Sequence, residues 1–291
     1  MKKSKNIITR FIQKFSKKFL PNSVYGFILF LRFRNKFKRS INKIKSSELF
    51  SKNLDEINNN EFKITSQNNE DGIIEYIFKK IPNSKVFVEI GLSYYEFNSL
   101  NLIKNNWSGL LVEQNFNECL VLRKLLNFYY PKLKVEIINK SINKENVDSV
   151  IVDNLKAKYI DFFSIDIDGN DYWVLKNLDL NNISCVCLEY NHWLGPNEKK
   201  TIPYNENHNF IDNGYFGASL LAFNELMNKK GFKLISIESS GTNAFFVKNE
   251  FSNLFEILDP IKSFKSVGRL YSKEQKIKIL KDIKSFNFIG V

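Results

Sequence analysis

Two glutamates and a glycine carry the first chemical signal in this sequence. Glu89 and Gly91 end the apolar run 86–90, and Glu113 ends the next apolar run, about 24 residues downstream. A glycine at a turn lets the backbone approach a ligand with no Cβ in the way. Glu89 would place negative charge near an ammonium or sulfonium group, and Glu113 could accept hydrogen bonds from both hydroxyls of a ribose. These residues predict a pocket for a cationic, ribose-containing ligand.

A second group of polar side chains ends two later apolar runs and consists of Asp166, Asp168, Glu189 and Asn191. Side chains two apart on a strand share one side, and neighbouring strands lie only about 4.8 Å apart. If the two runs form adjacent strands, the four side chains meet at one rim. Oxygen ligands of this kind suit Mg²⁺, and the predicted ligands are Asp168, Glu189 and Asn191. A metal there could hold and acidify an acceptor hydroxyl.

The same segment has two other interpretations. Without a metal, Asp168 or His192 could act as the general base that takes a proton from the acceptor. Alternatively, Asp-Gly-Asn-Asp at 168–171 is a turn that caps the following helix, with no chemical role. The loop that holds His192 and His208 also carries aromatic side chains, which would suit the ring of a sugar.

The elements that must position these groups follow a regular alternation. Predicted strands cover 86–90, 109–113, 135–138, 162–167, 185–190, 232–238 and 244–248, with helices at 71–80, 100–105, 119–128, 147–155, 171–178 and 218–230. Strands that alternate with helices predict a parallel sheet with helices on both faces. Only five residues join the last two strands, so they form an antiparallel hairpin. The expected fold is a Rossmann-like, mostly parallel seven-stranded α/β sheet with a C-terminal antiparallel hairpin.

The turn after the first strand indicates the kind of cofactor. Gly91 is the only glycine in the turn 91–96, whereas a dinucleotide fingerprint needs G-x-G-x-x-G. S-adenosylmethionine carries no phosphate and does not need three glycines. A parallel sheet finished by one antiparallel strand is also the arrangement of class I methyltransferases. The sequence therefore predicts a pocket for S-adenosylmethionine.

Several blocks resemble FkbM-like methyltransferases over about residues 65–248. The block 66–74 resembles their Ser-Gln-x-Gly-Glu-Asp-Gly opening; the other similar blocks are 166–172, 189–191, 215–220 and 241–247. Asn69 stands where the family has a glycine, and Ser93 replaces a second glycine of the cofactor loop. The resemblance implies transfer of a methyl group to a hydroxyl of a sugar or glycan. The residues expected at the cofactor are Gln67, Glu89, Gly91, Asn98, Glu113 and Asp166.

Positive charge is concentrated at the start of the chain. Residues 1–47 hold fourteen of the 43 Lys and Arg and no acid, which leaves 29 bases against 31 acids in the rest. Apolar residues at helical spacing over 8–19 predict a basic amphipathic helix, which suits an anionic membrane surface or else packs on the domain. Because the body is nearly neutral, nucleic acid is not the expected partner.

These observations predict three parts: a basic arm and linker at 1–60, a methyltransferase domain at 61–250 and a helical extension at 251–291. Three isolated cysteines, no signal-peptide pattern and no apolar run of membrane length predict a cytoplasmic protein, with the arm at the inner membrane surface. The main hypothesis is S-adenosylmethionine-dependent O-methylation of a glycan, with Mg²⁺ as a second cofactor. The alternatives are a nucleic-acid methyltransferase guided by the arm, and a non-catalytic binding protein with a decayed site.

Overall fold

The computed structural model of this protein describes residues 21, 24, 26–35, 38, 56–132, 134–266 and 271–291. The helix predicted over residues 8–19 lies outside these ranges. No helix in the described ranges is long and apolar enough to cross a membrane.

Seven strands form the central sheet, in the order β3-β2-β1-β4-β5-β8-β7. They are β1 (Val86–Ile90), β2 (Ser108–Glu113), β3 (Val135–Asn139), β4 (Ile160–Ile165), β5 (Ile183–Glu189), β7 (Phe232–Ile237) and β8 (Asn243–Lys248). The first five pair in parallel, and β8 lies antiparallel between β5 and β7. The predicted Rossmann-like sheet with its closing hairpin is confirmed, and this strand order is that of the class I methyltransferase fold.

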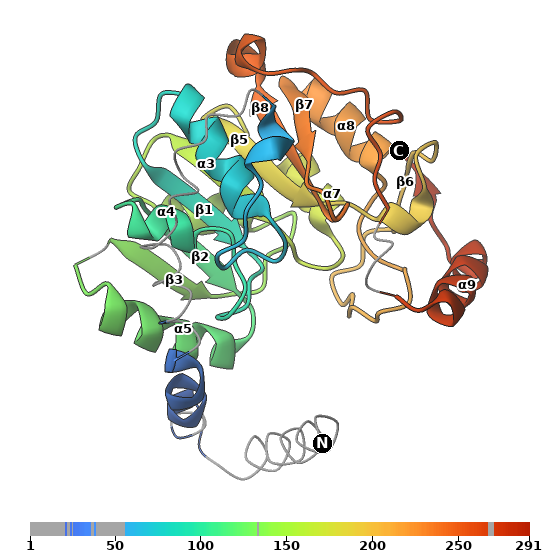
Figure 1. The fold of residues 1–291 in the computed structure, drawn as a ribbon. Coiled ribbons are helices and arrows are strands. Elements are labelled where there is room, and N and C mark those ends of the chain that lie inside the picture. Colours follow the sequence, from blue (N-terminus) through green and yellow to red (C-terminus); the bar gives the residue numbers. More distant parts are fainter. Residues whose placement is uncertain are drawn as a thin grey trace.

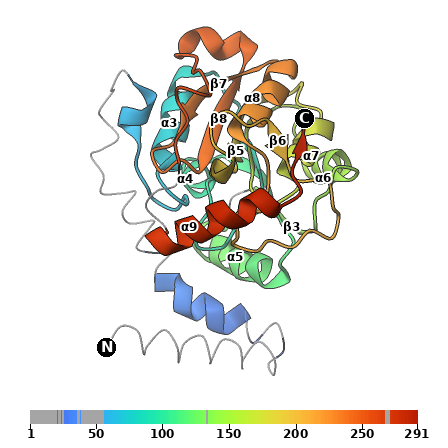
Figure 2. The same ribbon diagram turned by 90° about the vertical axis from the view of Figure 1, so that its right-hand side faces the viewer.

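Helices cover both faces of the sheet (Figures 1 and 2). They are α3 (Glu70–Lys80), α4 (Leu100–Lys104), α5 (Phe116–Tyr129), α6 (Val147–Asn154), α7 (Asp171–Asn177) and α8 (Leu220–Lys229). Side chains of α3, α4 and α5 pack in one apolar core, and those of α6, α7 and α8 pack in the other. Alternation divides β1 between them, since Phe87 joins the first core while Val88 and Ile90 join the second. Strands buried on both faces explain the continuous apolar runs of the sequence.

Two segments were not expected to be ordered parts of the fold. In the predicted linker, η2 (Ile57–Asn60) lies beside β7, where Asn58 Nδ2 donates to Ile237 O at 2.8 Å and Asn58 Oδ1 accepts from Ser236 Oγ. A small second sheet pairs β6 (Lys200–Thr201) with β9 (Ile289–Gly290) near the C-terminus.

The last part of the chain returns to the domain. It contains η4 (Asn249–Leu254), α9 (Lys273–Asp282), η5 (Ile283–Ser285) and β9. Tyr190, at the end of β5, donates its hydroxyl to Lys265 O at 2.5 Å. This segment therefore braces the loops that follow β5.

Residues 26–35 form a helix that packs against α5, below the sheet in Figure 1. Leu29 of this helix is buried in the core of α3, α4 and α5. The helix and α5 are also joined by a hydrogen bond from Tyr129 Oη to Arg34 O at 3.0 Å.

Candidate active site

The carboxyl ends of β1, β2, β4 and β5 surround a cavity of about 430 Å³. After β1 the chain moves toward β2 and β3 on one side, and β4 and β5 lie on the other. A cavity at this reversal of strand order is where α/β sheets bind their ligands. Its volume lies within the usual range for small-molecule sites, roughly 300–1,000 Å³.

All six predicted cofactor residues line this cavity: Gln67, Glu89, Gly91, Asn98, Glu113 and Asp166. The fold thus collects residues that are spread over about a hundred positions of the sequence. Their individual contacts, however, separate them into different roles.

Gly91 permits a close approach of two backbone segments. Its φ is +76°, and a Cβ placed there would lie 1.7 Å from the carbonyl oxygen of Asp166. The neighbouring amides complete this contact, because Gly91 N donates to Val112 O and Asp166 N donates to Ile90 O, both at 2.9 Å. The glycine is required by the approach of the β4 end, in addition to any contact with a ligand.

Glu89 holds the loop that leads into α4. Its side chain is only 3% exposed and accepts from Asn98 N at 2.8 Å, from Ser99 N at 2.9 Å and from Ser99 Oγ. Burial raises the pKa of Glu89 to about 7, against the opposing effect of these donors. Glu89 therefore fixes Asn98, whose side chain reaches Ser164 Oγ at 3.1 Å across the cavity floor.

Glu113 bridges the turns after β1 and β2. Oε2 accepts from Leu92 N at 3.1 Å, and Oε1 accepts from Asn115 N at 2.6 Å. The side chain remains partly exposed to the cavity, and its partial burial raises its pKa. The two hydrogen bonds thus hold the carboxylate in one orientation, and its partial exposure lets it accept hydrogen bonds from the hydroxyls of a ligand.

Ser93 makes hydrogen bonds within the loop that follows β1. Ser93 Oγ donates to Glu118 Oε2 at 2.8 Å, and Tyr94 N donates to the same oxygen at 2.9 Å. Ser93 and Glu96 also exchange backbone hydrogen bonds at 3.0 and 3.2 Å. Ser93 therefore anchors the turn to α5, and Glu118 is a cavity residue that sequence reasoning missed.

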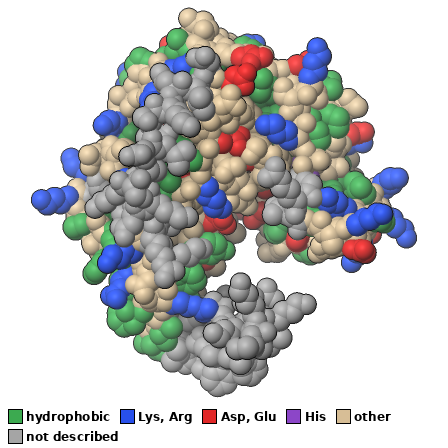
Figure 3. Space-filling model, in the orientation of Figure 1, with side chains coloured by type: hydrophobic (Ala, Val, Ile, Leu, Met, Phe, Trp, Pro, Cys, Tyr) green, Lys and Arg blue, Asp and Glu red, His purple; other side chains and the backbone are tan. Residues whose placement is uncertain are grey.

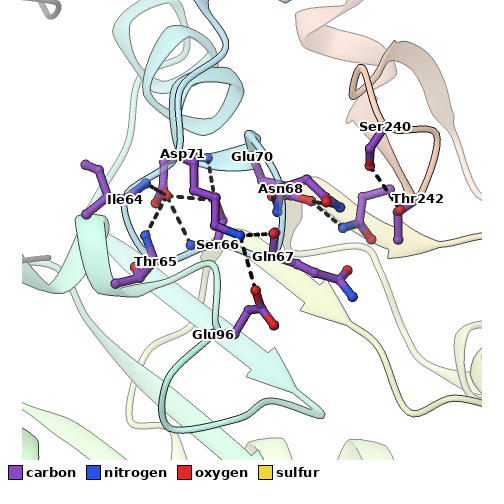
Figure 4. Close-up of polar contacts among 12 residues, drawn as sticks. Ile64, Thr65, Ser66, Gln67, Asn68, Glu70, Asp71, Glu96, Ser240 and Thr242 are labelled. Carbon is purple, nitrogen blue, oxygen red and sulfur yellow. Dashed lines mark hydrogen bonds and ion pairs between the residues drawn. The ribbon is translucent and has the colours of Figure 1, made fainter. Parts of the chain in front are cut away.

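The block 66–72 contributes Gln67 to one wall of the cavity, and its buried Asp71 carboxylate has a structural role (Figure 4). Asp71 Oδ2 accepts from the backbone amides of Ile64, Thr65 and Ser66 and from Ser66 Oγ, at 2.6 to 3.1 Å. Gln67 lies in the loop that Asp71 holds, and lines the cavity.

The same wall is joined to β8. Glu70 Oε1 accepts from Asn243 Nδ2 at 2.7 Å, and Asn243 also lines the cavity. Two blocks that are far apart in sequence, 66–74 and 241–247, therefore meet at one side of the site.

Three carboxylates converge on the other side of the cavity. Ligand oxygens of Asp166, Asp168 and Glu189 lie within 4.8 Å of one another. Burial, followed by the charge of Asp168, raises the pKa of Asp166 well above its usual range, and burial with the charge of Asp166 does the same for Glu189. Asp166 Oδ1 is buried without a hydrogen-bond partner among the described residues.

Asp168 has a strained backbone and an open side chain. Its φ is +55°, a left-handed conformation that aspartate tolerates better than most residues. The carboxylate keeps contact with solvent, and desolvation with the charge of Asp171 raises its pKa to about 6. Asp171 folds this turn by accepting from Ile167 N and Gly169 N, both at 2.9 Å. The N-cap residue of α7, Asn170, makes no side-chain capping bond, so the capping interpretation of 168–171 is not what the structure shows. Asp171 holds the turn, and the carboxylate of Asp168 is left open to the cavity.

Asn191 does not join the acidic cluster as the sequence predicted. Its Nδ2 donates to Gly214 O at 2.9 Å and Phe216 O at 2.7 Å, and its Oδ1 accepts from Trp193 N. β5 ends at Glu189, so the strand alternation that would place Asn191 beside Glu189 does not extend to residue 191. Asn191 organises the following loop, and this part of the metal prediction is corrected.

His192 is also displaced from its expected position. It is 9% exposed, and burial lowers its pKa to about 4. It is not among the residues that line the cavity. His192 is too weak a base, and it lies outside the cavity where an acceptor would bind. The prediction of His192 as a general base is therefore corrected.

The structure brings His208 to the cavity instead, together with Glu206. His208 packs on Gly169, where an added Cβ would lie 2.3 Å from its ring. The sequence predicted that this loop would border the site, but nothing in the pattern distinguished His208 from His192. The aromatic residues expected for a sugar ring are used differently: Trp193 packs on Tyr271, with ring centroids 5.0 Å apart. Tyr95 and Phe97 are the aromatic residues that line the cavity.

Acidic residues far outnumber basic ones in the lining of the cavity. Its carboxylic residues are Glu89, Glu96, Glu113, Glu118, Asp166, Asp168, Glu189 and Glu206, against Lys140 as the single lysine. Figure 3 shows acidic side chains near the middle of this face. Such a cavity favours a cation and disfavours phosphate groups.

No family model matches the chain, and no curated protein matches its sequence. Solved structures of similar arrangement include the N-terminal domain of EvdMO1 with SAH bound, at a TM-score of 0.44 and 11% identity over 63% of this chain and 80% of that one. Another is magnesium protoporphyrin IX methyltransferase (ChlM) from Synechocystis PCC 6803 with bound SAM. Its TM-score is 0.41 and its sequence identity 8%, over 62% of this chain and 77% of that one. The bifunctional kinase-methyltransferase WbdD has a TM-score of 0.35 and 15% sequence identity, over 56% of this chain and 34% of its own. The fold assignment therefore depends on the strand order, which is that of class I methyltransferases.

Proposed function

We propose that this protein binds S-adenosylmethionine in the cavity and transfers its methyl group to a hydroxyl of a sugar or glycan. One observation supports this above the others: an acid-lined cavity at the switch point of a class I methyltransferase sheet, with Glu113 aimed into it by Leu92 N and Asn115 N. When bound, S-adenosylmethionine supplies an electrophilic methyl group on a sulfonium cation.

The residues of the chain fit this cofactor in two ways. Glu113 is partly exposed and already oriented, so it can accept hydrogen bonds from ribose hydroxyls without reorganisation. The unpartnered Asp166 Oδ1 is a buried acceptor that needs a donor, and the ammonium group of the amino acid end is one. The excess of carboxylates favours the positively charged cofactor over an uncharged analogue.

Asp168 is the residue that we assign as general base. Its carboxylate is open to the cavity, and a pKa of about 6 leaves it ionised but basic near neutral pH. It would take the proton of the acceptor hydroxyl as the acceptor oxygen forms its bond to the methyl carbon and the bond between that carbon and sulfur breaks, with the neutral thioether as the leaving group. A neutral acceptor suits the acidic cavity, which argues against nucleic acid.

We further propose that the same three carboxylates can bind Mg²⁺. Asp166, Asp168 and Glu189 offer only oxygen ligands, the type that Mg²⁺ prefers. Activity measured with EDTA and then with added Mg²⁺ separates a metal-held acceptor from Asp168 acting as a free base. Loss and recovery would favour the metal, and unchanged activity would exclude it.

The resemblance to FkbM-like methyltransferases remains the source of the proposed acceptor class. A cytoplasmic location is likewise a proposal, supported by the free, buried thiols of Cys119, Cys185 and Cys187.

Titration calorimetry with S-adenosylmethionine tests the proposed function. We expect saturable binding by the wild type and a roughly tenfold higher Kd for Glu113→Ala, because a charge-assisted hydrogen bond is lost. Glu256→Ala, at an exposed glutamate outside the cavity, is the matched control and should bind normally. No binding by the wild type at millimolar cofactor would refute the proposal.

A further inference from the structure

The helix 26–35 has apolar residues on two opposite faces. The inner face packs on the domain: Leu29 is 5% exposed, and Phe30 meets Phe128 edge to face at 5.9 Å. Gly26 faces Leu120 of α5 so closely that an added Cβ would lie 2.4 Å from it. This face accounts for the attachment of the helix.

The outer face is exposed, although it is equally apolar. Val24, Phe27, Ile28 and Leu31 are 43%, 49%, 43% and 46% exposed. They follow one another at intervals of three, one and three residues, so they form one stripe on the helix. A stripe of four large side chains is more than the scattered apolar residues of an ordinary surface.

Basic residues border this stripe. Helical spacing places Arg32 and Arg34 on its two flanks, and Lys38 is exposed one turn further on. Lys124 of α5 lies over the ring of Phe27, 5.9 Å from its centroid. Figure 3 shows hydrophobic and basic side chains together over this helix at the lower left. An apolar stripe bordered by cations matches the acyl boundary and headgroups of an anionic bilayer.

The helix that carries the stripe also reaches the active-site cavity, through its inner face. At the end of the helix, Phe33 packs on Tyr94 at 4.7 Å and on Tyr95 at 6.1 Å between ring centroids. Tyr95 lines the cavity. A membrane bound to the helix would therefore lie close to the rim of the cavity.

We propose that helix 26–35 docks on an anionic lipid bilayer through Val24, Phe27, Ile28 and Leu31, with the flanking arginines on the headgroups. The methyl acceptor would then reach the cavity from the membrane surface. A second copy of the chain fits less well, because two such stripes face to face would bring like-charged arginines together. Docking itself does not depend on the proposed methyl transfer.

Co-sedimentation of the full-length protein with vesicles tests the proposal. Vesicles of phosphatidylcholine with a third of phosphatidylglycerol are compared with vesicles of phosphatidylcholine alone. We expect binding to the anionic vesicles, weakened by salt, and a roughly tenfold lower partition coefficient for Phe27→Asp and Leu31→Asp. Val152→Asp is the matched control, because Val152 is 75% exposed on α6, away from this helix.

Each outcome decides the question. If Phe27→Asp and Leu31→Asp bind vesicles as tightly as Val152→Asp, the stripe is not the docking surface. If the wild type does not bind vesicles, and light scattering shows a dimer that Leu31→Asp dissociates, the stripe binds a second copy of the chain instead of a membrane. Thermal melting shows that the variants fold, and calorimetry with S-adenosylmethionine reports separately on the cavity, so failure of the membrane proposal and failure of the proposed function are distinguished.

Discussion

The two sides of the cavity use acidic residues in opposite ways. On the side of β1 and β2, Glu89, Glu113 and Glu118 accept hydrogen bonds from backbone amides at 2.6 to 3.1 Å. On the side of β4 and β5, Asp166, Asp168 and Glu189 face one another. The first arrangement satisfies the carboxylates and holds loops in place. The second leaves charge uncompensated, which raises pKa values and prepares groups for chemistry or ligand binding.

This comparison teaches that an acid at the end of a strand has no fixed role. Glu89 lies near the end of β1, and Asp166 directly follows the adjacent parallel strand β4. Yet Glu89 is a clamp, whereas Asp166 keeps a buried oxygen without a partner among the described residues. The difference lies in the loops. The amides of Asn98 and Ser99 donate to Glu89, whereas the turn after Asp166 gives the amides of Ile167 and Gly169 to Asp171.

The largest effect is expected at Asp168. Asp168→Asn should lower kcat by about 100- to 10,000-fold, because the amide cannot take a proton. The Kd for S-adenosylmethionine, measured by calorimetry, should change less than about threefold, since the cofactor contacts are elsewhere. Wild-type activity should rise with pH through about 6, where the carboxylate ionises, and then level off. Asp153→Asn, at an exposed position on α6, should behave as wild type; an equal loss there, or an unaffected Asp168→Asn, would contradict the assignment.

Glu89→Ala should be the most damaging change to stability. It leaves the amides of Asn98 and Ser99 and the Ser99 hydroxyl without their buried acceptor, at a cost of about 2–4 kcal/mol in the free energy of unfolding. Urea denaturation measures this cost. Glu256→Ala should lie within about 0.5 kcal/mol of wild type. A Glu89→Ala protein of wild-type stability would show that the clamp is unimportant.

The pH dependence of stability tests the same residue from another direction. The pKa of Glu89 is raised by folding from 4.5 to about 7, so the folded state favours the protonated acid. Its contribution is therefore full below about pH 4.5 and is lost as the pH rises toward 7, with a slope of at most about 1.4 kcal/mol per pH unit. Glu89→Gln should lose this component. Urea midpoints between pH 5 and 8 that fall equally in both proteins would assign the effect to other groups.

The smallest effect is expected at Ser93. Ser93→Ala removes one hydrogen bond to Glu118, while Tyr94 N keeps its own. The Kd for S-adenosylmethionine should rise by only about fivefold, which corresponds to about 1 kcal/mol. A complete loss of binding would mean that Ser93 contacts the ligand directly.

Much of the fold could be predicted from local pattern. Strands buried on both faces produce continuous apolar runs, and a five-residue link permits only an antiparallel return, so β1 to β5 and the hairpin of β7 and β8 were all located. The small sheet of β6 and β9 was not, because it has only two residues in each strand and joins segments about ninety positions apart. The role of Asn58 against β7 was hidden for the same reason.

By itself the sequence determined where the cavity lies, because strand ends and the switch point depend on periodicity and connection length. It placed Glu89, Gly91, Glu113 and Asp166 there. The tertiary structure decided what each of them does. Hydrogen-bond donors come from loops whose course no periodicity encodes, so only the folded chain distinguished the clamp at Glu89 from the open carboxylate of Asp168, and His208 from the buried His192.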